Sequence, residues 1–327
     1  MVNIAILKKK NLKSLKLLYN THPGMLMLCS DDLHPEMLQK RHINKLIAGL
    51  ISEGFNEFDV IRSATINPVE HYKLDIGLLR KGDNADFIVV DNPEKMNVLE
   101  TWINGEKVFD KGKILFEYSG ESAVNIFNCR PLETDDILIR NKKEKIRVIV
   151  AEEGELITKE IHVSSGISDF VLQDINNDLL KIVVKDRYKD APPAIGFIKG
   201  FNLKNGAFAS SVAHDSHNII AIGANDIDII NSINEITRLK GGLAVSYDGT
   251  VKSLKLDIGG IMTTHSCEET ANEYDTLNQL VRSLGCSMNA PFMTLSFMAL
   301  LVIPDLKIGD RGLFDVKKFE PVSLFIK

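Results

Sequence analysis

The stretch Met25–Pro35 reads MLMLCSDDLHP and passes from an apolar run to a polar one. Its first four residues, Met25–Leu28, predict a short buried strand, of the kind found in parallel sheets that are covered on both faces. In an α/β barrel, a polar residue just past the C-terminal end of a strand faces the active-site mouth. Asp31 is therefore the first candidate catalytic residue, as an oxygen ligand to a metal ion, with Asp32 and His34 as further candidates. These aspartates could equally cap the helix that follows.

The residues around this strand predict helices. Leucines recur at helical spacing within Asn11–Tyr19, and Glu36–Glu53 has a similar apolar pattern. A further helix begins at Asp59–Ala64 and should end before Asn67-Pro68. This order is typical of the end of a βα barrel, but one strand cannot close a barrel that needs eight. We expect residues 1–76 to form the incomplete end of such a barrel.

Residues 77–120 have the composition of β structure. Phe87–Asp91 and Val98–Ile103 predict strands, and Glu106–Phe109 predicts the return strand. Asn104-Gly105, between two such runs, is the strongest short hairpin signal in the chain. We expect a small β-sandwich unit here.

Residues 121–327 show a mixed pattern that predicts an α+β domain. The fold class expected for the whole chain is therefore α/β plus α+β. The expected strands are Asp135–Ile139, Ile146–Val150, Ile157–His162, Leu180–Lys185, Ile219–Gly223 and Leu243–Tyr247; the expected helices are Asp226–Lys240 and Glu268–Leu284; and Asp305–Asp315 is expected to be a loop.

A second group of candidate site residues lies at His214, Asp215, His217 and Asn218. An imidazole beside a carboxylate can bind a metal ion, move a proton or hold a polar ring. On a strand, His214 would face one side of the sheet, and Asp215 and His217 the other. The alternative is a buried polar network that fixes a domain interface. Both interpretations stay open from the residues alone.

His265, Glu268 and Glu269 form a third possible metal cluster. Ser266 and Glu269, however, have the spacing of a capping box at the start of a helix. We favour the cap.

The composition of the 327-residue chain excludes some functions. The net charge of −5 gives no electrostatic basis for binding nucleic acid or an anionic membrane. Four scattered cysteines without a C-x-x-C pair are typical of reduced thiols in a cytoplasmic protein. The longest apolar run is too short to span a bilayer.

Four long segments resemble one known family. Residues 27–44 (MLCSDDLHPEMLQKRHIN) are similar to the last barrel strand and helix of adenine deaminases, which belong to the amidohydrolase superfamily. Residues 77–116 resemble the β-sandwich tail of amidohydrolases. Residues 192–226 (PPAIGFIKGFNLKNGAFASSVAHDSHNIIAIGAND) and 291–316 (PFMTLSFMALLVIPDLKIGDRGLFDV) resemble the additional C-terminal domain of adenine deaminases.

This resemblance implies a metal-dependent hydrolase with a (β/α)8 barrel. In the family, manganese or iron activates a water molecule that attacks carbon six of adenine, and a carboxylate moves the proton, so that hypoxanthine and ammonia form. Asp31 matches the barrel-strand-eight aspartate that carries this proton. The implied setting is adenine catabolism and purine salvage in the cytoplasm, with adenine as substrate and a homo-oligomeric assembly.

The sequence also departs from the family. The family's first-strand H-x-H pair and later metal-binding histidines have no counterpart in this chain, and they would lie upstream of Met1. We therefore expect a chain that is incomplete or inactive alone and that works with an upstream N-terminal fragment. Two alternatives are a non-catalytic module for purine binding or oligomerisation, and a different amidohydrolase reaction on a related purine.

Overall fold

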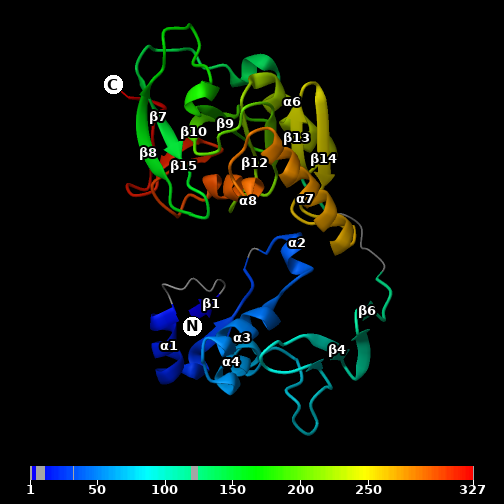
Figure 1. Cartoon of the computed structure of the whole chain (residues 1–327). Coiled ribbons are helices and arrows are strands. Elements are labelled where there is room, and N and C mark those ends of the chain that lie inside the picture. Colours follow the sequence, from blue (N-terminus) through cyan, green and yellow to red (C-terminus); the bar gives the residue numbers. More distant parts are fainter. Residues whose placement is uncertain (1, 5–11, 32, 119–123, 327) are drawn as a thin grey trace. The chain divides into compact units, whose positions relative to one another are not determined.

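The computed structural model describes residues 2–4, 12–31, 33–118 and 124–326. The chain separates into two units, Met1–Ser119 and Gly120–Lys327 (Figure 1). Each unit has its own apolar core. Across the described residues, no helix has both the length and the apolar character that crossing a membrane requires.

The first unit is built around a short parallel pair of strands. β1 (Val2–Ile4) pairs with β2 (Leu26–Leu28) in parallel, and all three β2 side chains are buried. The buried strand expected at Met25–Leu28 is thus confirmed for Leu26–Leu28, whereas Met25 ends a 3₁₀ turn and is exposed. The core around β2 takes apolar side chains from α1 (Leu12–Thr21) and from the helices that follow β2.

The helix expected over residues 36–53 is interrupted. It consists of α2 (Pro35–Leu38) and α3 (Ile43–Ser52), because His42 has extended dihedral angles (φ −139°, ψ −152°). Helix α4 (Glu57–Ala64) ends where expected, but α5 (Ile66–Tyr72) begins at once. Pro68 lies in the first turn of α5, where its missing N–H has no helical partner to lose.

Four antiparallel strands complete the first unit. They follow one another in the sheet in chain order: β3 (Phe87–Val90), β4 (Val98–Ile103), β5 (Glu106–Asp110) and β6 (Lys113–Ile114). Ile103 pairs with Glu106 across the turn, and Asn104 and Gly105 both have positive φ (52° and 80°), so the predicted hairpin is confirmed. Among the described residues this stretch forms one sheet, where a sandwich requires two.

The second unit contains a nine-stranded mixed sheet. Its order is β14-β13-β11-β12-β9-β10-β7-β18, with β8 also paired to β7, and the β10–β7 pair is parallel. The strands are β7 (Lys145–Val150), β8 (Lys159–Ser164), β9 (Leu180–Lys185), β10 (Ala194–Lys199), β11 (Ala207–Ser210), β12 (Ile219–Gly223), β13 (Gly242–Tyr247), β14 (Thr250–Lys255) and β18 (Phe325–Ile326).

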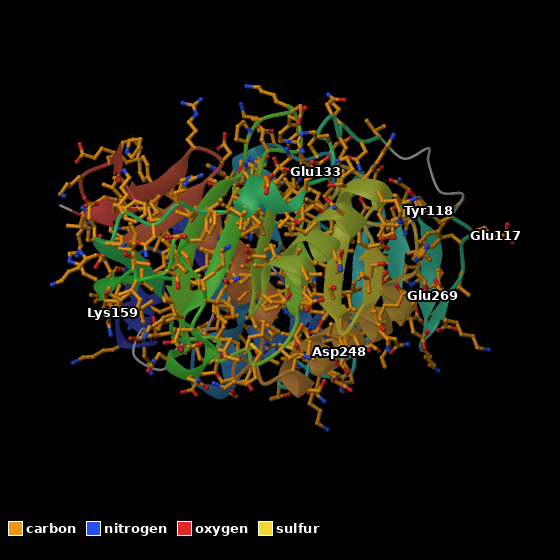
Figure 2. The ribbon with its side chains drawn as sticks, turned by 90° about the horizontal axis from the view of Figure 1, so that it is seen from above. Glu117, Tyr118, Glu133, Lys159, Asp248 and Glu269 are labelled. Atoms are coloured by element: carbon orange, nitrogen blue, oxygen red, sulfur yellow. The ribbon has the colours of Figure 1, made fainter. Side chains whose placement is uncertain are left out.

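Helices cover both faces of this sheet (Figure 1). Helix α6 (Asp226–Leu239) packs on the face that carries Val183, while α7 (Cys267–Ser283) and α8 (Pro291–Ser296) pack on the face that carries Ile182 and Val184. Because both faces are covered, all six side chains of β9 are buried. Lys159 at the start of β8 and Glu269 in α7 lie toward opposite edges of this unit (Figure 2).

Two expectations for the second unit are wrong. The strand expected at Asp135–Ile139 is a 3₁₀ turn, η3 (Thr134–Ile137), because Glu133 and Asp136 form a reciprocal capping box. The loop expected at 305–315 is a hairpin of β15 (Leu306–Gly309) and β16 (Gly312–Asp315). The chain thus has mixed α/β content with several sheets, and the partial barrel stays a prediction.

Candidate functional site

Asp31 follows the buried strand β2, as the sequence analysis expected. Its side chain is exposed and its backbone is left-handed, with φ 53°, a conformation that aspartate tolerates better than most residues. Burial raises the pKa of the neighbouring Cys29 thiol, and the negative charge of Asp31 raises it further. Asp31 thus places a charged carboxylate at the end of the strand.

Asp32 and His34 are the other two candidate residues near Asp31. Asp32 lies outside the described residues. His34 stands at the N-terminal cap position of α2, where its side chain makes no capping hydrogen bond. Its Nδ1 atom lies 3.7 Å from the Oε1 atom of Glu36.

The described residues do not form a metal centre by themselves. No three histidine, cysteine, aspartate or glutamate side chains in the described part of the chain are grouped so that they could hold a metal ion. Asp31 offers a hard oxygen donor, but a catalytic zinc-type or manganese-type centre needs several donors converging on one point. The residues described therefore do not fit the metal that the family implies.

The segment from His214 to Asn218 connects β11 and β12, two buried strands in the middle of the large sheet. It is a turn and not a strand, so the alternation of faces that a strand would give does not apply here. The backbone N–H of His217 donates to the Ala213 carbonyl at 2.6 Å, and His217 has a positive φ of 51°. Such a turn brings side chains together that a strand would separate.

The two imidazoles of this segment are neighbours. Their ring centroids lie 5.7 Å apart, and the His214 ring stacks on Phe297 at 4.9 Å with an interplanar angle of 19°. Phe297 belongs to η5 (Phe297–Ala299), which follows α8, and the His214 N–H donates to the Ser296 carbonyl at 3.2 Å. The His214 ring is thus fixed by a helix on one face of the sheet.

The exposure of this segment varies from residue to residue. His214 and His217 are half-buried, Asp215 is exposed and Asn218 is buried. A turn with two half-buried imidazoles and one exposed carboxylate can hold a polar ring or exchange a proton with a ligand.

Two residues that the sequence analysis did not select also belong to this site. The Asn218 Oδ1 atom accepts a hydrogen bond from the Arg187 backbone N–H at 3.2 Å, and the Tyr188 hydroxyl donates to the Ser216 carbonyl at 3.0 Å. Because Lys185 pairs with Ile219 in antiparallel strands, the residues after β9 lie beside those before β12. The charged run of residues 186–190 follows β9 directly in the sequence. It could have indicated Arg187 and Tyr188 only together with the pairing of β9 and β12.

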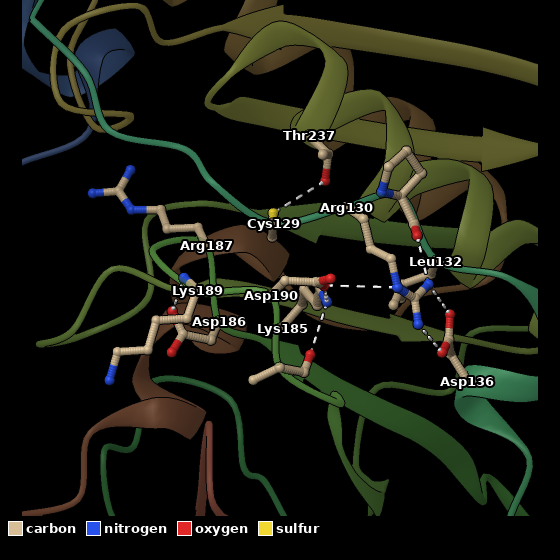
Figure 3. Close-up of polar contacts among 12 residues, drawn as sticks. Cys129, Arg130, Leu132, Asp136, Lys185, Asp186, Arg187, Lys189, Asp190 and Thr237 are labelled. Atoms are coloured by element: carbon tan, nitrogen blue, oxygen red, sulfur yellow. Dashed lines mark hydrogen bonds and ion pairs between the residues drawn. The ribbon is translucent and has the colours of Figure 1, made fainter.

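An ion network holds the segment after β9 in place (Figure 3). The Arg130 guanidinium forks onto both Asp136 oxygens at 2.6 and 2.7 Å, and its Nε lies 3.6 Å from the Oδ1 of Asp190. Lys185 Nζ lies 3.5 Å from the same oxygen and donates to the Ala191 carbonyl at 2.8 Å. The Arg130 fork lowers the pKa of Asp136 to about 2. Arg187 points away from this network (Figure 3).

The third candidate cluster is a helix cap. Ser266 Oγ accepts from the Glu269 N–H, and the Glu269 carboxylate accepts from the Ser266 N–H, so both halves of the capping box of α7 are present. The interpretation of His265, Glu268 and Glu269 as a cap is confirmed.

Comparison with known proteins identifies the class of both units. Residues 11–108 match the family model described as "Amidohydrolase family", and residues 155–320 match the model described as "Adenine deaminase C-terminal domain". The second match covers half of the chain and includes the segment from His214 to Asn218. The chain belongs to the adenine deaminase family, through this C-terminal domain.

Curated relatives support the assignment over most of the chain. An adenine deaminase of Methanosarcina mazei is 46% identical over 97% of this chain and 60% of its own length. One of Methanosarcina acetivorans is 47% identical over 97% of the chain and 59% of its own length. One of Borreliella burgdorferi is 43% identical over 90% of the chain and 54% of its own length. The chain thus spans about 60% of the length of the curated relatives it matches.

Proposed function

We propose that this chain takes part in the hydrolytic deamination of adenine to hypoxanthine and ammonia. The observation that carries the proposal is the 46% identity, over 97% of the chain, to a protein named adenine deaminase. The setting would be adenine catabolism or purine salvage in the cytoplasm. The expected partners are a further copy of the chain or a separate upstream fragment.

Asp31 is the residue that we propose as proton carrier and metal ligand. Its position after a buried parallel strand supports this role, because strand ends in such barrels supply catalytic groups. Manganese or iron, the metal that the family resemblance implies, would need further donors besides Asp31, because the described residues supply no group of three. The division of the chain into a barrel end at 1–76, a β unit at 77–120 and a C-terminal domain at 121–327 belongs to the same proposal.

A coupled assay for ammonia tests the proposal. The purified chain, supplied with Mn²⁺, is incubated with adenine both alone and with the part of the Methanosarcina mazei relative that lies outside the match. We expect ammonia and hypoxanthine from the mixture and little or none from the chain alone. No ammonia from either sample would contradict the proposed activity.

Two matched variants test the role of Asp31 in that mixture. Asp31→Asn keeps the size of the side chain and removes its charge, so we expect ammonia release to fall at least about a hundredfold, as for loss of a general acid–base group. Asp75→Asn changes an exposed aspartate of the same unit and should leave the rate unchanged. Equal rates for the two variants would remove Asp31 from the catalytic residues.

The second candidate function is a non-catalytic purine-binding or oligomerisation module. It is favoured by the location of the whole segment from His214 to Asn218 within the second unit, which has its own core. Calorimetric titration of the chain with adenine tests it. Binding that His217→Ala abolishes, without ammonia in any sample, would favour the module over the enzyme.

A further inference from the structure

The turn after β9 is unusually well fixed for a surface connection. Asp186 Oδ1 accepts from the N–H groups of Tyr188 and Lys189 at 2.8 and 3.2 Å, a local turn that the aspartate side chain closes. On one side Lys185 is fully buried and bonded to Ala191, and on the other Asp190 lies within the reach of Arg130. This turn therefore offers a rigid base for the side chains that it carries.

The Arg187 side chain is buried in this turn and held between two aromatic rings. Its side chain is 5% exposed, and its guanidinium carbon lies 4.9 Å from the Phe127 ring centroid and 4.7 Å from that of Tyr188. A methyl group added at Gly260 would come within 2.0 Å of the Arg187 Nη1 atom, so the backbone there closes off the guanidinium. Stacked on two rings, the guanidinium has little freedom left to lose.

Tyr188 connects Arg187 to the segment from His214 to Asn218 through two hydrogen bonds. Its hydroxyl accepts a hydrogen bond from Arg187 Nη2 at 2.8 Å and donates one to the Ser216 carbonyl at 3.0 Å. The Ser216 carbonyl lies in the middle of the turn that carries His214 and His217. Beside it, the Arg187 backbone N–H donates a hydrogen bond to the Oδ1 atom of the buried Asn218 side chain. One relay of hydrogen bonds thus runs from a buried cation to the turn between the two imidazoles.

We propose that Tyr188, oriented by Arg187, is the positioning residue that sets the geometry of His214 and His217 for purine recognition. The geometric part of this inference stands on the contacts above, and its link to purine rests on the proposed function. Neither residue needs to touch the ligand. The relay acts by holding the Ser216 peptide, and hence the two flanking imidazoles, in one arrangement, which lowers the cost of ordering them on binding.

The test uses the imidazole signals of the chain, which has eight histidines. Tyr188→Phe removes only the hydroxyl and so breaks both hydrogen bonds of the relay. Arg187→Lys keeps the charge and removes the planar group that orients Tyr188. Tyr247→Phe is the matched control, because Tyr247 lies in β13 and its hydroxyl has no hydrogen bond within the described residues. Far-UV circular dichroism checks that each variant is folded.

We expect Tyr188→Phe and Arg187→Lys to shift the NMR signals of His214 and His217, assigned by single substitution, and to leave the other six in place. Adenine affinity, measured by calorimetry, should fall about tenfold in Tyr188→Phe, the size of effect expected when one hydrogen-bond relay is lost. Tyr247→Phe should change neither quantity.

Three results would contradict the positioning role, its link to adenine binding, or the proposed function. Unmoved His214 and His217 signals in folded Tyr188→Phe would overturn the positioning role. Shifted signals with unchanged adenine affinity would overturn its link to recognition. If the wild-type chain neither binds adenine nor releases ammonia in the mixture, the proposed function fails, while the NMR shifts still decide whether Tyr188 positions the two imidazoles.

Discussion

The Nζ atom of Lys181 lies 2.7 Å from each carboxylate oxygen of Asp226, at the point where β9 meets the N-terminus of α6. The lysine side chain is fully buried and also donates to the Ile137 carbonyl at 3.0 Å. Burial lowers the pKa of Lys181, and the hydrogen bond to Asp226 opposes that change. This pair therefore fastens α6 to the sheet through a lysine that is buried away from water and an aspartate that is partly exposed.

Lys181→Met should be strongly destabilising. It leaves the Asp226 carboxylate partly buried without its cation, and breaking such a pair typically costs about 3–5 kcal/mol. The double variant Lys181→Met/Asp226→Asn removes the stranded charge and should recover about half of that loss. Urea unfolding at pH 7, followed by circular dichroism, measures both, with Lys252→Met on an exposed position of β14 as control. A double variant no more stable than the single one would show that the charge is not the cause.

Lys307 should make the free energy of unfolding rise with pH. It is fully buried in β15, donates to the Leu156 and Phe297 carbonyls, and burial lowers its pKa to about 8. Above pH 8 the folded chain has lost this proton, while the unfolded chain keeps it up to the ordinary lysine pKa of 10.5. The unfolded state then binds more protons, so stability rises with pH in this window, by about 1 kcal/mol between pH 8 and 9.

The upper end of that window is limited by Cys286. Burial raises the pKa of its thiol from 9.0 to about 11, so that above pH 9 the folded chain holds a proton that the unfolded chain loses, and stability falls. Urea unfolding of the wild type and of Lys307→Met should therefore be compared at pH 7, 8 and 9. The rise should be present in the wild type and absent in the variant. A rise of the same size in both would show that another group causes it.

Asp136 should stabilise the second unit in a different pH range. Its pKa is lowered to about 2 by the Arg130 fork, so its contribution is complete above the ordinary aspartate pKa of 3.8 and is lost as the pH falls toward 2. Asp136→Asn should lower stability at pH 6 and reduce the loss seen between pH 4 and 2.5. Asp135→Asn, one residue earlier on an exposed position, is the control. Identical acid unfolding curves for the two variants would contradict the assignment.

The sequence could predict those parts of the fold that depend on short-range patterns. β9 and β12 were expected at the residues where they occur, because Ile182–Val184 and Ile219–Ile222 are short apolar runs rich in β-branched residues. The hairpin at Asn104-Gly105 and the cap at Ser266 follow from local chemistry alone.

The parts that failed depend on partners distant in the chain. The segment from His214 to Asn218 was considered only as it would lie on a strand, whereas it is a turn in which the His217 N–H donates to the Ala213 carbonyl. The contribution of Tyr188 to the same segment depends on the pairing of Lys185 with Ile219, which a periodicity argument does not contain. Asp31 was placed after its strand correctly, whereas its chemical role stays a prediction.

The start of α7 offers the last prediction. Ser266 Oγ accepts from the Glu269 N–H at 3.2 Å, and Glu269 returns a bond to the Ser266 N–H at 3.1 Å. Ser266→Ala removes the acceptor for an N–H that has no helical partner, so unfolding should become easier by about 1 kcal/mol. Glu269→Gln keeps a side chain that can complete the box and should cost less. Ser283→Ala, at the other end of the same helix, controls for the loss of a serine hydroxyl. If Ser266→Ala and Ser283→Ala unfold at the same urea concentration, the cap does not stabilise α7.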